Sequence, residues 1–178
     1  INSTGTILVY TSVFTGNYPI SGTKSISRTS TVNYASAVID QTVSSAMTYG
    51  TLRISGGTIK SLASNLPALS SSNSSSGRIF IDAGTFDLKT FTANRSAAGG
   101  GSITISAGAK LMIGGTNGFP ANYLTHSIAS TSTVEYYGNN QTVAATTYGN
   151  LVLKATSGSV TKTMPASALV IAGDFSMA

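Results

Sequence analysis

Residues 130–154 read STSTVEYYGNNQTVAATTYGNLVLK, and residues 28–54 read RTSTVNYASAVIDQTVSSAMTYGTLRI. The blocks STVxY, QTV and TYGxL occur in both stretches in the same order, and Lys60 then corresponds to Lys162. The separation between corresponding blocks drifts little, and the length changes fall in gaps rich in Gly, Ser and Asn, because loops tolerate insertions and strands do not. The correspondence between the two stretches therefore predicts a repeat of about 100 residues.

Around this repeat, short segments alternate apolar and polar residues with a period of two, which is the pattern of β-strands. Gly, Asn, Ser or Pro bounds each segment, and no segment keeps a helical apolar spacing over three turns. The pattern predicts an all-β protein. We expect strands at residues 6–10, 30–34, 51–55, 77–82, 85–91, 102–106, 109–114, 132–136, 150–154, 159–163 and 168–172.

The spacing of these strands favours one kind of all-β fold. Hairpin sandwiches carry turn signals every 8–12 residues or so, whereas one coil of a β-solenoid takes about 20–25 residues before the chain returns to the rung below. The steps from Val134 to Leu151 and from Val32 to Leu52 are closer to the second length. We therefore predict a parallel β-helix of about seven or eight coils, roughly 35–40 Å long. The alternative is a tandem pair of β-sandwich adhesin domains of about 100 residues each, with a linker near residues 65–77.

We expect residues 1–178 to form one continuous solenoid segment, with residues 1–75 as a partial repeat and residues 76–178 as a full one. The sequence begins and ends inside the strand pattern, for example with SALVIAGDFSMA at residues 167–178. We therefore expect a window from a longer chain, in which neighbouring repeats of the same chain are the first partners.

Composition narrows the classes of partner. Only 8% of the residues are charged, whereas 25 are Thr and 28 are Ser. In a parallel stack like charges would recur about every 4.8 Å, so a hydroxyl-rich surface avoids repulsion. The net charge of +5 comes from scattered cations, which argues against nucleic-acid binding. The chain has no Cys, and its apolar runs fall short of the roughly 20 residues that span a membrane. We expect no nucleic-acid partner and no membrane span.

Candidate chemistry is sparse. Asp82 and Asp87 are the only close pair among five carboxylates, and a Gly-containing turn separates them. His126 is the single histidine. A zinc site or a catalytic triad needs further fixed partners that the sequence does not single out. We expect no catalytic residues, no metal site and no cofactor, and we predict that the protein is not an enzyme.

Four tyrosines recur in register: Tyr34, Tyr49, Tyr136 and Tyr148. An aromatic ladder for sugar stacking is one interpretation. The other is a structural set of stacked rings at the coil edge, which we favour because large rings supply much buried area.

The second copy has a characteristic set of spaced residues: Val134, Tyr136, Gln141, Val143, Tyr148, Asn150, Leu151, Leu153, Lys162 and Gly173. In these residues it resembles the repeats of very large secreted surface proteins of the Bacteroidetes. The resemblance covers most of the chain, and in the first copy Thr51 and Ser36 stand where the second copy has Asn150 and Gly138. It implies a right-handed parallel β-helix, export by the type IX route, a place outside the cell or on the bacterial surface, and a role as adhesin stalk or gliding-type filament.

The sequence thus predicts a structural or adhesive repeat segment of a large exported bacterial surface protein. Such a segment acts as a stalk or spacer, and its expected partners include other copies in a filament or bundle and a surface polysaccharide. Two alternatives stay open: a carbohydrate-binding or carbohydrate-active β-helix module, and an ice-binding solenoid with flat Thr rows.

Overall fold

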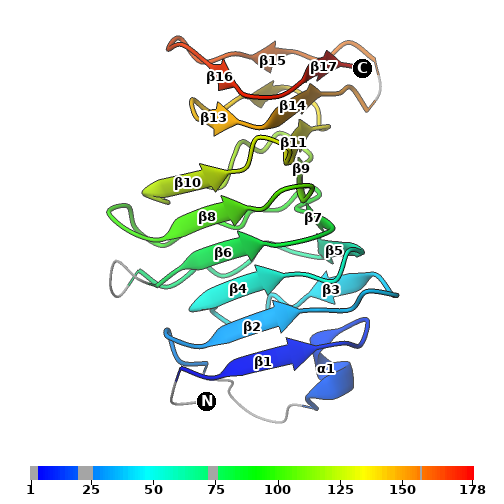
Figure 1. The fold of residues 1–178 in the computed structure, drawn as a ribbon, viewed down its shortest axis with the longest axis vertical. Coiled ribbons are helices and arrows are strands. Elements are labelled where there is room, and N and C mark those ends of the chain that lie inside the picture. The colour runs from blue at the N-terminus through cyan, green and yellow to red at the C-terminus, as the bar shows by residue number, and fades with distance from the viewer. Residues whose placement is uncertain (1–3, 20–25, 72–75, 157) are drawn as a thin grey trace.

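The computed structural model describes residues 4–19, 26–71, 76–156 and 158–178. The chain winds around one axis as a right-handed parallel β-helix, and every strand pair among the described residues is parallel. In Figure 1 the strands of the front sheet point the same way while the coils climb from the N-terminus to the C-terminus. The predicted all-β parallel β-helix is confirmed. Two facing layers of antiparallel strands, which the sandwich alternative requires, do not match this pairing.

One side of the coil, the first side, is a six-stranded sheet in the order β1-β2-β4-β6-β8-β10. Each of these strands is four residues long, because a solenoid side turns into the next at a corner. The strands are β1 (Thr6–Val9), β2 (Thr31–Tyr34), β4 (Thr51–Ile54), β6 (Arg78–Ile81), β8 (Ser102–Ile105) and β10 (Thr125–Ile128).

The second side is a seven-stranded sheet in the order β17-β14-β11-β9-β7-β5-β3. From β2 to β11 its strands alternate along the chain with strands of the first side, which is how a solenoid lays equivalent segments on top of one another. The strands are β3 (Gln41–Val43), β5 (Ile59–Leu62), β7 (Thr85–Asp87), β9 (Lys110–Ile113), β11 (Thr133–Tyr136), β14 (Asn150–Leu153) and β17 (Phe175–Met177).

A third side closes the coil and is less regular. Its lower rungs are joined by the parallel bridge between Leu69 and Arg95 and by the bond from Arg95 N to Ala121 O at 3.1 Å. Its upper rungs are β12 (Gln141–Thr142) and β15 (Lys162–Thr163), which pair with each other.

Above β10, the first side continues with β13 (Thr147–Tyr148) and β16 (Val170–Ile171). A contact between the two parts is made by His126 Nδ1, 3.1 Å from Thr146 Oγ1. The helix α1 (Phe14–Asn17) lies at the N-terminal end and buries Phe14. The sequence pattern gave no indication of this helix because four residues are too few for a helical period.

The core runs along the axis as columns of inward side chains. In the first side, Ile7, Val32, Leu52, Ile79 and Ile103 occupy one register position on successive rungs, and all are buried. Parallel in-register pairing places like residues above one another, so each rung covers the apolar face of the rung below. In each of these strands the alternating apolar residues thus face the core.

All eleven predicted strand segments contain strands of the structure, with shorter bounds. Six strands were not predicted as separate strands: β3, β5, β10, β12, β13 and β17. The predicted boundary between residues 75 and 76 adjoins residues 72–75, which lie outside the described residues, as does part of the proposed linker. On either side of it, β4 pairs with β6 in the same sheet, and the division into a partial and a full repeat stays a prediction.

The two sequence copies lie on different sides of the solenoid. The STVxY block forms β2 on the first side in one copy and β11 on the second side in the other. The QTV block likewise moves from β3 on the second side to β12 on the third. The second copy is therefore displaced by one side of the coil relative to the first. Both copies form short coils, in which the STVxY strand pairs directly with the TYGxL strand that follows it.

Candidate functional site

The four recurring tyrosines lie inside the solenoid. All are fully buried, so none offers the exposed ring face that sugar stacking needs. Tyr34 Oη lies 3.0 Å from Tyr49 Oη, and Tyr136 Oη lies 3.0 Å from Tyr148 Oη. The two tyrosines of each pair reach across one short coil and meet through their hydroxyl groups in its interior. Ring stacking at a coil edge is not the contact that joins them.

Each pair also holds the turn that follows the QTV block. In the first copy Ser44 N donates to Tyr34 Oη at 2.8 Å, and Tyr49 Oη donates to Ser44 O at 2.6 Å. In the second copy Ala144 takes the place of Ser44, with distances of 3.2 and 2.9 Å. Burial raises the pKa of all four phenols, so these groups stay neutral and serve as hydrogen-bonding groups.

A recurring glutamine joins adjacent coils. Gln41 Nε2 donates to Val9 O at 2.9 Å and to Thr11 O at 2.7 Å, both on the rung below. Its Oε1 accepts from Ser36 N at 3.0 Å. Gln141 repeats the arrangement, donating to Ile113 O and Asn117 O and accepting from Gly138 N. One amide side chain thus bonds three backbone groups at the corner, and one of them, Val9 O or Ile113 O, also accepts a backbone N–H of the rung above.

The recurring lysine pairs in register with that glutamine on the next rung. Lys60 is fully buried, and its Nζ donates to Ser36 O at 2.6 Å and Thr58 Oγ1 at 2.5 Å. Lys162 Nζ donates to Gly138 O at 2.7 Å and Gln141 Oε1 at 2.5 Å. Burial lowers the pKa of both amines, and the charge of Asp40 partly opposes the shift at Lys60.

A recurring glycine forms the corner after the second tyrosine of each pair. A Cβ on Gly50 would lie 2.2 Å from Arg28 O, and a Cβ on Gly149 would lie 2.2 Å from Ala129 O. No side chain fits at either corner, because the obstacle is backbone of the rung below. The recurrence of Tyr, Gln, Lys and Gly is visible in the sequence, but their contacts are not. In each copy they make a polar network of two parts: the tyrosine pair with its turn, and the glutamine with its lysine. The signal was present in their polar character at positions repeated as strictly as apolar ones.

The carboxylates that catalysis would need are dispersed. Asp82 forms an ion pair with Arg53 on the first side, whereas Asp87 lies on the second side and accepts from Tyr137 Oη at 2.8 Å. The structure therefore does not bring Asp82 and Asp87 into one cleft. His126 sits against the ring of Phe119 with centroids 4.8 Å apart, and burial lowers its pKa.

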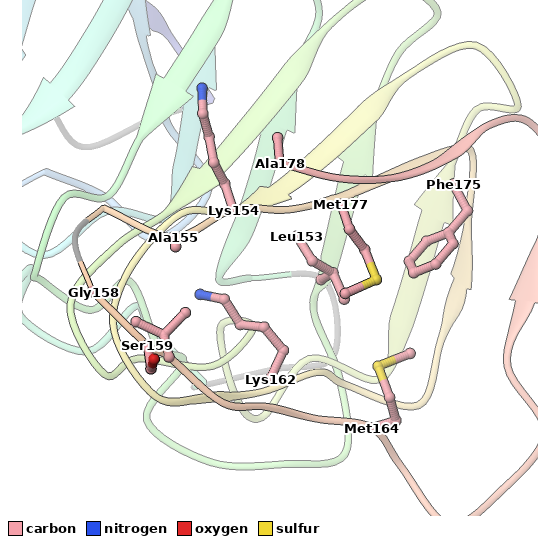
Figure 2. A pocket seen from close by; sticks show the side chains of 11 residues that line it. Leu153, Lys154, Ala155, Gly158, Ser159, Lys162, Met164, Phe175, Met177 and Ala178 are labelled. Carbon is pink, nitrogen blue, oxygen red and sulfur yellow. The ribbon is translucent and has the colours of Figure 1, made fainter.

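The C-terminal end of the coil stack carries a cavity of about 800 Å³. Leu153, Val160, Met164, Phe175 and Met177 supply its apolar lining. Figure 2 shows Leu153, Met164 and Met177 turned toward a common space, with the amine of Lys154 directed away from it. Phe175 and Met177 belong to the inward column of the second side, since they pair in register with Leu151 and Leu153. The cavity is the uncovered end of the core.

Comparison with known protein families, curated proteins and solved structures finds no match for this chain. Among the described residues, no group of three or more His, Cys, Asp or Glu side chains lies close enough to hold a metal ion. No helix in the described part of the chain has the length and apolar character to cross a membrane. The arrangement that stands out is thus the twice-built polar network together with the open end of the stack.

Proposed function

We propose that the protein is a structural and adhesive repeat segment of a large exported bacterial surface protein, where it acts as a stalk or spacer. Export by the type IX route and an origin among the Bacteroidetes belong to the same proposal. The support for this proposal is the recurrence of the STVxY, QTV and TYGxL blocks, together with a composition that is poor in charged residues and rich in Ser and Thr.

The observation that carries the proposal is that the recurring glutamines and lysines form hydrogen bonds between one coil and the next. Gln41 and Gln141 each bond two carbonyls of the rung below, and Lys60 and Lys162 each bond the rung beneath theirs. A binding or catalytic module would place its recurring polar groups where a ligand reaches them. Here they stiffen the axis, which is what a spacer needs.

Surface labelling of producing cells tests the proposal. Antibodies raised against the folded chain are applied to intact cells and to permeabilised cells, with an antibody to a cytoplasmic enzyme as control. We expect labelling of intact cells that protease treatment of the cell surface removes. Labelling that requires permeabilisation would contradict the surface role.

A mechanical measurement adds a second test. The chain is held by handles at Thr4 and Ala178 and stretched along the solenoid axis. A stiff spacer extends little until coils open in discrete steps, because each coil contacts only its neighbours. A protein that lengthens smoothly at low force does not suit the role of a stalk.

A further inference from the structure

The two ends of the solenoid are built differently. At the N-terminal end, Gly5 O and Val9 O accept from the backbone of the second rung, so parallel pairing turns the groups of Leu8 and Tyr10 toward the outer edge of β1. Tyr18 Oη donates to Leu8 O at 2.8 Å, and Asn17 Oδ1 accepts from Tyr10 N at 2.8 Å. The segment that contains α1 therefore covers the strand edge with side-chain hydrogen bonds, one of the ways in which edges are protected.

The C-terminal end has no such cover over the described strand edge. Asp174 O accepts from Leu151 N at 2.9 Å, and Ala178 N donates to Leu153 O at 3.0 Å. The backbone groups of Phe175 and Met177, which alternate with these, therefore point to the outer edge of β17. Their side chains are 49% and 74% exposed, although they stand in the inward column.

The earlier copy contains the same rung with its cover in place. Leu52 pairs with Ile79 as Leu151 pairs with Phe175. Gly77 N donates to Gly50 O at 2.8 Å, and Gly173 N donates to Gly149 O at 2.9 Å, so β6 and β17 are equivalent. The covering strand on β6 is β8. It stacks Ile103 on Ile79 and Ile105 on Ile81, and the two covered residues are 1% and 0% exposed.

We propose that the open C-terminal end is an interaction surface for one further β-coil, whose strand adds parallel to β17 with apolar residues at two alternate positions, as β8 adds to β6. The cavity shown in Figure 2 is the space that its apolar side chains fill. The identity of the partner as a repeat coil rests on the proposed function, whereas the geometry of the surface stands without it. The N-terminal end of a second copy is not the partner, because Asn17 and Tyr18 occupy the edge of β1.

The chain supplies its own probe. Because Met177 corresponds to Ile81, residues 83–128 appended after Ala178 bring a second copy of the β8 strand over β17 in the register of β8 on β6. The matched control carries the same extension with Ile103→Asp and Ile105→Asp in the appended strand only. Oxidation of Met177 by dilute peroxide is followed by peptide mass spectrometry, and buried Met47 serves as the internal reference for an intact fold.

We expect the extension to slow oxidation of Met177 by about tenfold or more relative to the parent chain, and the control extension to leave it fast. Met47 stays protected in all three proteins. Equal rates at Met177 in the two extended proteins, with Met47 protected, overturn the proposal. So does a parent chain that sediments as a stable dimer with Met177 already protected, because the partner is then a second copy joined end to end. These outcomes are independent of surface labelling, which tests the proposed function separately.

Discussion

The hydroxyl of Tyr34 lies 3.0 Å from the hydroxyl of Tyr49, and Tyr136 and Tyr148 repeat this contact in the second copy. Because Tyr49 Oη donates to Ser44 O, the proton between the two phenols belongs to Tyr34. The pair is therefore a directed chain of hydrogen bonds that ends on the backbone of the turn. It is built from side chains whose register recurs about 100 residues later.

Replacement of Tyr34 by Phe should destabilise the protein. The substitution keeps the ring but leaves Ser44 N without the hydroxyl that accepts from it, and an unsatisfied buried donor costs about 1–3 kcal/mol. Urea unfolding measures the change. Tyr34→Phe combined with Tyr49→Phe should cost less than the sum of the two single changes, since the residues share one network. Tyr10→Phe changes an exposed side chain and is the control. If Tyr10→Phe lowers the free energy of unfolding as much as Tyr34→Phe does, the hydrogen bonds of the tyrosine pair are not the cause of the loss.

The corner glycines give a sharper test. Gly50→Ala and Gly149→Ala each place a Cβ 2.2 Å from a backbone oxygen of the rung below. That backbone cannot move aside without breaking its strand pairing. We expect both variants to lose the cooperative unfolding transition or to be recovered as insoluble protein. Gly118→Ala is the matched control, since its Cβ meets only Thr142 O at 3.5 Å. Wild-type stability in Gly149→Ala is incompatible with the described corner.

Alkaline pH should unfold the protein through its buried phenols. Their folded pKa values lie above the ordinary value of 10.0 because of burial. Above pH 10 the unfolded chain loses phenolic protons that the folded chain keeps, so the free energy of unfolding falls as pH rises. Tyrosinate absorbance in the near ultraviolet and the far-ultraviolet circular dichroism signal should change together. An absorbance change that is complete before the fold is lost would contradict the burial of these rings.

Lys60 should produce the opposite slope at lower pH. Burial lowers its pKa below the ordinary value of 10.5, so between the folded and unfolded pKa values the unfolded chain binds more protons, and stability rises with pH. Lys60→Met removes the buried amine and should flatten this rise. Urea unfolding between pH 7 and pH 10 measures the difference from wild type. Lys154→Met, on an exposed side chain, should leave the slope as it is, and an identical slope in Lys60→Met would show that the amine is solvated.

Sequence periodicity sufficed for the fold because each side of the coil is short and strictly alternating. Val134 and Leu151 are register partners on consecutive rungs, so the spacing counted along the sequence is the length of a coil. The next coil is longer, since the register partner of Leu151 on the following rung is Phe175. The added residues lie on the third side, around β15 (Lys162–Thr163).

The polar network was harder to predict because the position of a residue in a repeat does not reveal whether its side chain faces the interior or the solvent. Gln41 sits in a strand segment, where a polar residue is expected to face solvent, yet it is buried. Its side chain turns inward because the corner offers Thr11 O and Ser36 N, which strand pairing does not bond, and Val9 O as a further acceptor. The same holds for Lys60, which bonds Ser36 O of the rung beneath it. Only the partner rung, which is distant along the sequence, explains these residues.

The displacement of the second copy by one side has a consequence for any rod made from tandem copies. With three sides to a coil, each successive copy turns its equivalent surface to a new bearing around the axis, and roughly 300 residues pass before the first bearing returns. In such a rod no single side carries all the equivalent surfaces. A weak contact carried once per copy is then presented on each of the three sides in turn, so that three successive copies present it on all sides of the rod.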